Sequence, residues 1–231
     1  MKMAAKSTSL FASFSSEKEA SCSFLKKRTK TLLLVCCICL AWSPDIALAA
    51  AQAGAVVAIR GDCFDTSGSK RGPLKSGDAV YVGDMVEVPA PARLRLRMID
   101  GSMLSAASGT TLTIAAYGKD PSGHRDVALD MAAGLLRAVV AHVEQPSRFE
   151  VKTATGTAAV RSTDWFVSTT NAAMQVGVLD GRVALTSAAS GQTVVIPPRW
   201  GARLQRGLDP VPPRVWSAAE FADVIGRTDV P

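Results

Sequence analysis

Polar and apolar side chains alternate along much of the chain, and this alternation constrains the fold more than any other feature. In residues 93–98, three arginines alternate strictly with Leu94, Leu96 and Met98. Successive side chains of a β-strand point to opposite faces of a sheet, so the pattern predicts a strand with one buried and one solvated face. Short runs of this kind recur up to residue 204, separated by glycine, proline and aspartate. We therefore expect an all-β body of about a dozen short strands, built as a β-sandwich or as a solenoid-like double-stranded β-helix.

Two Asp-Gly pairs, Asp100-Gly101 and Asp180-Gly181, lie between apolar runs 80 residues apart. As catalytic carboxylates of a glycosidase, they would have to lie about 5–10 Å apart across a sugar. As two-residue type I′ hairpin loops, they would need positive φ at both positions, which Asp tolerates and Gly adopts readily. We interpret both pairs as hairpin turns, and their spacing as a hint of two stacked halves. The predicted turn residues, which include two Gly-Asp pairs, are Gly77, Asp78, Gly83, Asp84, Asp100, Gly101, Asp180 and Gly181.

The C-terminal residues 205–231 have a different pattern. Three prolines within residues 209–213 predict a stiff linker. Ser217 with Glu220 three residues later fits a capping box, and Trp216 just before it would suit a hydrophobic staple. The apolar residues that would share one helical face are Phe221, Val224 and Ile225. We expect a short helix that docks on the β-body or, alternatively, binds a partner.

Residues 1–49 have the three-part layout of a secretory signal peptide. A basic cluster at residues 26–30 precedes an apolar run over residues 32–42, and the small-residue site Ala47-Leu48-Ala49 follows. The apolar run is eleven residues long, whereas a helix that spans a membrane needs roughly 20. We predict a mature protein that starts at Ala50, is periplasmic or secreted, and meets the membrane only through its export signal. An uncleaved N-terminal anchor is the alternative.

The basic character of the chain comes largely from the predicted signal peptide. The chain holds 26 Lys and Arg against 20 Asp and Glu, a net charge of +6. Residues 1–49 contain seven of the basic and three of the acidic residues, which leaves 19 against 17 and a net charge of +2. So small an excess is weak support for nucleic-acid binding, and we expect no nucleic-acid partner.

The sequence offers few residues for catalysis or metal binding. Four of the five cysteines lie in residues 1–49, which leaves Cys63 without a disulfide partner. A metal site made of Cys63, His124 and His142 would be poor in ligands and has no familiar spacing. The Gly-Asp pairs lack the dense acidic spacing of calcium loops, and no nucleophile elbow or phosphate-binding glycine motif occurs. We therefore predict a non-enzymatic protein without catalytic residues, metal or cofactor.

Four residues are candidate contacts with a partner or a polyanion. Arg93, Arg95 and Arg97 share one face of a predicted strand, where they are either solvated or available to an acidic polysaccharide or to lipid phosphates. Trp165 and Phe166 would point to opposite faces of an extended segment, one into the core and the other to a surface or interface. We keep Trp165 with the three arginines as possible contact residues.

The order of these strands and turns resembles the FecR-like periplasmic domain family. Residues 74–86 contain a doubled Gly-Asp pattern, and residues 94–102 contain a strand that runs into an Asp-Gly-Ser turn. Residues 159–167, AVRSTDWFV, are similar to the Val-Arg-Gly-Thr segment of the family, with Ser162 where glycine is usual. Further similar segments are residues 129–135, 149–155, 178–183 and 196–204. The resemblance extends over residues 54–204.

The resemblance implies a secreted β-rich domain that binds or scaffolds. The best-known members relay a signal across the inner membrane and carry a cytoplasmic sigma-factor-binding domain, for which residues 1–25 are too short. We expect recognition or scaffolding of an envelope protein or polysaccharide, with an exposed β-edge available to a partner strand. A membrane-tethered signal-transduction subunit and a polysaccharide-acting enzyme are the two alternatives. The sequence does not indicate the oligomeric state.

Overall fold

The computed structural model describes residues 50–143 and 147–230, which form 17 strands and one helix, α2 (Ala218–Thr228). The strands are β1 (Gln52–Arg60), β2 (Phe64–Ser67), β3 (Lys70–Pro73), β4 (Ala79–Tyr81), β5 (Met85–Val88), β6 (Arg93–Met98), β7 (Met103–Ala106), β8 (Thr110–Lys119), β9 (Arg125–Val139), β10 (Ser147–Lys152), β11 (Gly156–Val160), β12 (Asp164–Thr169), β13 (Ala173–Asp180), β14 (Val183–Ser187), β15 (Thr193–Ile196), β16 (Trp200–Gln205) and β17 (Arg214–Val215). The predicted all-β fold with a short C-terminal helix is confirmed. The predicted signal peptide lies outside the described residues.

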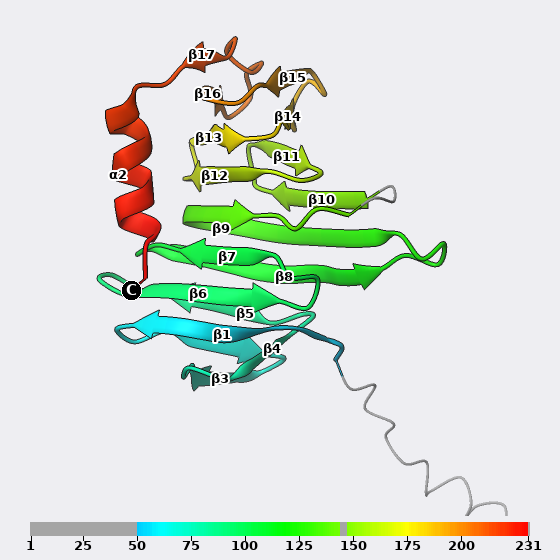
Figure 1. Cartoon of the computed structure of the whole chain (residues 1–231), viewed down its shortest axis with the longest axis vertical. Helices are drawn as coiled ribbons and strands as arrows, with labels where there is room; N and C mark the ends of the chain where they lie inside the picture. Colours follow the sequence, from blue (N-terminus) through cyan, green and yellow to red (C-terminus); the bar gives the residue numbers. More distant parts are fainter. Residues whose placement is uncertain (1–49, 144–146, 231) are drawn as a thin grey trace, which may run out of the picture. The chain divides into compact units, whose positions relative to one another are not determined.

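The strands form one continuous mixed sheet that is folded into two layers, and strand β9 belongs to both layers (Figure 1). Sheet A has the order β4-β1-β6-β7-β9-β12-β13-β16-β17. Sheet B has the order β3-β2-β5-β8-β9-β10-β11-β14-β15. All neighbouring strands are antiparallel except β9 and β10, which are parallel. In each layer, β9 therefore has four strands on either side.

The chain crosses between the layers at Gly134, within β9. Up to Ala133 this strand pairs with β8 in sheet B, and from Gly134 onward it pairs with β12 in sheet A. Gly134 has φ +107°, and a Cβ atom built on it would lie 2.3 Å from the Cα atom of Thr110. The Thr110 hydroxyl donates to the Ala107 carbonyl at 2.6 Å and accepts from the N–H of Leu135 at 3.1 Å. The crossing thus requires both positive φ and a close approach of two strands, which glycine alone permits.

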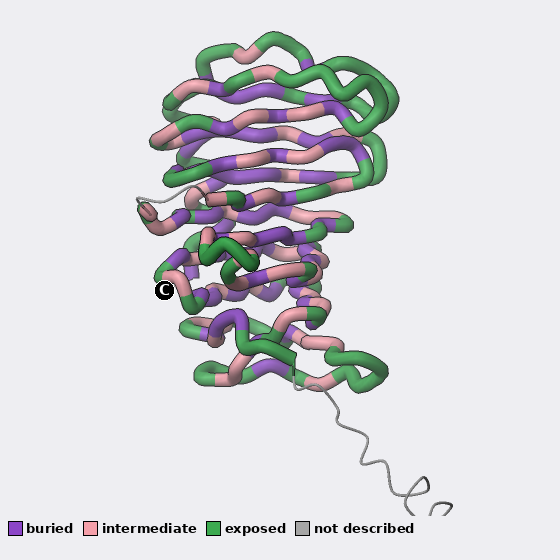
Figure 2. Tube along the Cα trace, turned by 90° about the vertical axis from the view of Figure 1, so that its right-hand side faces the viewer, coloured by how far each residue is buried: buried purple, intermediate pink, exposed green. Residues whose placement is uncertain are grey.

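The main core contains side chains from both sheets. In β6, Leu94, Leu96 and Met98 are buried while the arginines between them point outward, as the alternation predicts. Trp165 and Phe149 are among the largest fully buried side chains. Figure 2 shows the same alternation of buried and less buried residues along successive strands of the stack. Burial of each large apolar side chain stabilises the fold by roughly 1.5–3 kcal/mol, so this alternation is the main source of stability.

Helix α2 lies against the outer face of sheet A (Figure 1). Phe166, on β12, packs against Trp216 and Phe221, with ring centroids 5.0 and 6.0 Å away. Ser217 and Glu220 form the predicted capping box, and Trp216 packs on Phe221 at 5.6 Å as a hydrophobic staple. Of the predicted apolar face, Phe221 and Val224 are buried. The docked helix therefore supplies a second, smaller hydrophobic cluster outside the main core.

The two Asp-Gly turns differ in the structure. Asp100-Gly101 joins β6 to β7 as a hairpin within sheet A. Asp180-Gly181 instead leads from β13 in sheet A to β14 in sheet B, and these strands do not pair, so the predicted second hairpin is wrong. The predicted type I′ geometry is wrong for both, because the glycines have φ near +85° whereas neither aspartate has positive φ. A turn motif shows where the chain reverses but not which layer the next strand joins.

The position of Gly134 at the crossing in β9 predicts that a larger residue there lowers the stability of the fold. Replacing Gly134 by Ala should lower the free energy of unfolding by about 3 kcal/mol, because the new methyl group meets Thr110 and the left-handed conformation is unfavourable. The control is Gly118→Ala in β8, where no atom lies within 4 Å of the added Cβ and φ is not positive. That variant should stay within about 1 kcal/mol of the wild type in urea unfolding. Equal losses in both variants would contradict the assignment of Gly134 as the crossing point.

Candidate functional site

A buried arginine at the start of β9 connects segments from four parts of the chain. The side chain of Arg125 is 6 % exposed. Its Nη1 donates to Asp100 Oδ2 at 3.1 Å and to the Ala141 carbonyl at 2.8 Å. Its Nη2 donates to Ser147 Oγ at 3.2 Å and to the Arg161 carbonyl at 2.6 Å. Arg125 thereby fixes the β6–β7 turn, the segment after β9, the start of β10 and the β11–β12 turn around one point.

The carboxylate of Asp100 is fully engaged within this cluster. Its Oδ1 accepts from the hydroxyl of Tyr117 at 2.7 Å and from the N–H of Ser102 at 2.9 Å. Its Oδ2 accepts from the Ser102 hydroxyl at 2.9 Å in addition to Arg125. Burial, and then the nearby negative charge of Asp100, raise the pKa of Tyr117 above its usual value. The phenol therefore remains a hydrogen-bond donor, and these contacts give the cluster a structural role.

Asp180, the aspartate of the other Asp-Gly turn, has a different environment. Asp180 is exposed, and its register partner across sheet A is Asp164 rather than Asp100. The Asp164 carboxylate is held by Arg137, with Nε–Oδ1 and Nη2–Oδ2 distances of 3.0 and 2.7 Å. Asp100 and Asp180 thus lie on separate turns, and none of the pockets found among the described residues is lined by both.

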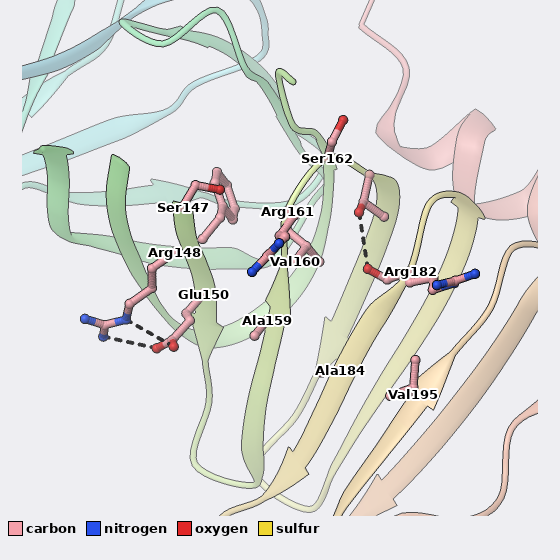
Figure 3. A pocket seen from close by; sticks show the side chains of 12 residues that line it. Ser147, Arg148, Glu150, Ala159, Val160, Arg161, Ser162, Arg182, Ala184 and Val195 are labelled. Carbon is pink, nitrogen blue, oxygen red and sulfur yellow. Dashed lines mark hydrogen bonds and ion pairs between the residues drawn. The ribbon is translucent and has the colours of Figure 1, made fainter. Parts of the chain in front are cut away.

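A groove of about 420 Å³ runs over the outer face of sheet B (Figure 3). Its sides carry Arg148, Arg161 and Arg182, and small side chains such as Ala159 and Ala184 line it between them. Arg148 forms ion pairs with Asp126 and Glu150 at 3.2 and 3.1 Å, whereas Arg161 and Arg182 form none with the described residues. In Figure 3 the side chains of Arg161 and Arg182 point away from each other.

This arrangement has no catalytic geometry. Among the described lining residues Glu150 is the one carboxylate, and Arg148 binds it. A glycosidase needs two carboxylates that face a common space, and a nucleophilic site needs a base within hydrogen-bonding reach of the nucleophile. The groove offers diverging positive charges over a small-residue surface, which suits contact with anionic groups.

Two of the three arginines of the predicted polyanion face bind the end of helix α2. Arg93 donates to the carbonyls of Gly226 and Asp229, both at 2.9 Å, and Arg95 pairs with the Asp229 carboxylate at 2.8 Å. Cations are favourable at the C-terminal end of a helix, where carbonyls lack intrahelical partners. Arg97 is exposed. The alternation could place these arginines on the outer face but could not show that the chain's own helix returns to cover two of them.

Trp165, the fourth candidate contact residue, is fully buried in the main core and cannot touch a partner. Its neighbour Phe166 faces the other side of sheet A, as the extended geometry predicts, and packs under α2. The interface inferred for one of the two aromatic residues is therefore an internal contact with the C-terminal helix.

The Gly-Asp pairs lie in turns. Gly77 and Gly83 have φ +93° and +96°, and Asp78 and Asp84 each accept a hydrogen bond from the backbone N–H three residues earlier, at 2.7 and 2.8 Å. Among the described residues, no group of three or more His, Cys, Asp and Glu side chains could hold a metal ion. Burial raises the pKa of the Cys63 thiol to about 11, so Cys63 is a protonated core residue.

Comparison with known proteins finds a family match for the segment around Arg125. Residues 84–184 match the model of a family described as FecR protein. This segment, which is less than half of the chain, is similar to the FecR family. It contains Asp100, Arg125 and the Arg161 turn, so the cluster that joins four segments lies wholly within the matched residues. No curated protein sequence matches the chain.

The fold of the chain also has solved counterparts. Two crystal structures of a candidate anti-sigma factor from Parabacteroides distasonis ATCC 8503, at 1.65 and 2.50 Å resolution, align with a TM-score of 0.51. Sequence identity is 15 %, and the alignment covers 60 % of this chain and 62 % of that protein, less than two thirds of its length. At this identity the similarity concerns the fold alone. Within the described residues, no helix has the length and apolar character needed to cross a membrane.

The contrasting environments of the two aspartates predict contrasting mutant stabilities. Asp100→Ala should lower the free energy of unfolding by about 3 kcal/mol, because it leaves the buried charge of Arg125 without its carboxylate partner. Asp180→Ala removes an exposed carboxylate and should change stability by no more than about 0.5 kcal/mol. Urea unfolding of both variants measures the difference, and similar losses would show that the carboxylates have equivalent roles.

The capping box predicts a pH dependence for helix docking. The hydrogen bond from Arg214, and then that from the Ser217 N–H, lower the pKa of Glu220 from 4.5 to about 2. The stabilisation from the ionised carboxylate is therefore present above pH 4.5 and is lost as the pH falls through about 2. The difference in melting temperature between wild type and Glu220→Gln should be constant above pH 5, should narrow progressively as the pH falls from about 4.5, and should be nearly gone at about pH 2.

Removing the arginine provides the control. In an Arg214→Ala background the carboxylate loses its main stabilising partner, so the difference should be smaller above pH 5 and should close at a higher pH. A gap between Glu220→Gln and its parent that is independent of pH in both backgrounds would contradict the role of this ion pair in fixing α2.

Proposed function

We propose that this protein is a non-enzymatic component of a FecR-type signal-transduction system that acts through contacts with an envelope partner. The observation that carries the proposal is the FecR family match over residues 84–184. The similarity of the fold to a candidate anti-sigma factor supports the same role. Both comparisons favour signalling over general scaffolding or polysaccharide recognition, which the sequence alone had placed first.

The chemistry of the described residues is consistent with a contact protein. The half-buried carboxylate of Asp100 binds Arg125, and that of Asp164 binds Arg137. The groove on sheet B has no pair of carboxylates among its described lining residues. These acidic groups are held by structural partners, which suits a rigid domain that presents surfaces rather than reacting groups. A polysaccharide-acting enzyme is the less supported alternative.

Export and cleavage before Ala50 are part of the proposal. Mass spectrometry of the protein recovered from the cell envelope should find a mature N-terminus at Ala50. A protein that retains residues 26–49 and fractionates with the membrane would instead be a tethered subunit. Either result leaves the signalling role open to a separate test.

The signalling role is tested by transcription. Deleting the gene should change the transcript levels of a limited set of promoters, and the wild-type gene and the Asp180→Ala variant should both restore them. Asp100→Ala, which destabilises the domain, should fail to restore them. Unchanged transcripts together with an altered composition of envelope polysaccharides would favour the enzyme and refute the proposal.

A further inference from the structure

Three of the four sheet edges carry features that prevent pairing with another chain. Strand β3, at one edge of sheet B, contains Lys70, Arg71 and Pro73. Strand β4, at one edge of sheet A, has three residues, and β17, at the other edge, has two and follows the proline-rich residues 210–213. Charges, prolines and short length are the usual protections of an edge strand. Strand β15, the remaining edge of sheet B, has neither a charged residue nor a proline.

The free side of β15 is defined by its pairing with β14. The N–H of Ser187 donates to the Gln192 carbonyl at 2.9 Å, which sets the alternation of the antiparallel ladder. The backbone groups of Thr193 and Val195 consequently point away from β14, and β15 has no other strand partner among the described residues. Pro197, which has no N–H, ends this free edge. Two donors and two acceptors therefore remain open.

Strands β15, β16 and β17 lie at the same end of the molecule (Figure 1), and several exposed apolar residues belong to these strands or to the segments that connect them. The exposed residues are Val195, Leu208, Val211 and Val215, at 58, 56, 53 and 60 %. Trp200, at the start of β16, is also 37 % exposed. An apolar surface of this kind next to open backbone groups is typical of an interaction site.

We propose that this end binds a second copy of the chain, through antiparallel pairing of β15 with β15 of the partner around a two-fold axis. Thr193 of each copy lies opposite Val195 of the other, which allows four backbone hydrogen bonds. The pairing extends sheet B across the dimer, and the exposed valines and leucine add apolar contact. This inference is independent of the proposed signalling role.

The chemistry of the edge favours a second copy over another partner. A two-fold contact places the same segment of both copies side by side, so any charge in that segment would lie near a like charge of the other copy. Residues 189–198 carry no charge at all. By contrast, β3 would bring Lys70 and Arg71 close to their own copies. β15 is thus the one edge of sheet B that can pair with itself without repulsion.

Sedimentation equilibrium of the protein as recovered from the cell envelope tests the proposal. The wild type should dimerise at concentrations of about 10–100 µM, as expected of a small interface. Thr193→Pro removes an N–H that β14 does not use, and Val195→Lys places a charge on the edge. Each should weaken dimerisation by at least about tenfold while the melting temperature stays close to that of the wild type. The control, Val57→Lys in β1, replaces another exposed valine and should dimerise normally.

Hydrogen exchange locates the contact. The amides of Thr193 and Val195 should exchange more slowly as protein concentration rises, whereas the amide of Val194, which faces β14, should be protected at every concentration. A wild type that stays monomeric up to about 1 mM, or a dimer that Thr193→Pro and Val195→Lys leave unchanged, would overturn the proposal. So would protection of these two amides that does not depend on concentration.

Discussion

The contact between Arg125 and Asp100 is the interaction on which the rest of the domain depends. One guanidinium group binds a carboxylate, a hydroxyl and two carbonyls from segments that are far apart in sequence. Its Nε has no hydrogen-bond partner among the described residues. A buried charge of this kind is costly unless its partners are held in place, so the four segments must assemble together for the fold to be stable. The FecR family match encloses this cluster.

Much of the fold could be predicted from local patterns. The alternation in β6 gave the buried and exposed faces, and the capping box and staple gave the start of α2, because these signals depend on neighbours within a few residues. Layer membership could not be predicted. The turn at Asp180 contains the same two residues as the turn at Asp100, yet one changes layers and the other does not. That choice depends on which strands are already paired, and this information is distributed along the chain.

The candidate site was less predictable than the fold, for the same reason. Arg125 stands in a polar segment, GHRDVALD, where it reads as one more surface charge. The one available signal was its place directly before the apolar residues of a strand. The three arginines of β6 show the opposite error, since their regular spacing suggested a site for an external anion. The structure shows that Arg93 and Arg95 bind the last turn of α2, which approaches them from more than 130 residues away in sequence.

The outer faces of the two sheets differ, because only that of sheet A is covered by the helix. Helix α2 lies on the outer face of sheet A and fills it with an aromatic cluster, whereas the outer face of sheet B holds the open groove. The apolar end at β15 to β17 adjoins this groove. Val195 of β15 lies at the border of the groove and belongs to the apolar end as well, so the two surfaces adjoin on sheet B.

The single strand that passes through both layers has a mechanical consequence. In an ordinary sandwich the layers are tied together by loops and can slide past each other by repacking side chains. Here β9 is hydrogen-bonded into sheet B over its first part and into sheet A over its last part. Shear between the layers would therefore have to break ladder hydrogen bonds on one side of Gly134, so a load applied to either layer is carried by the backbone of the other.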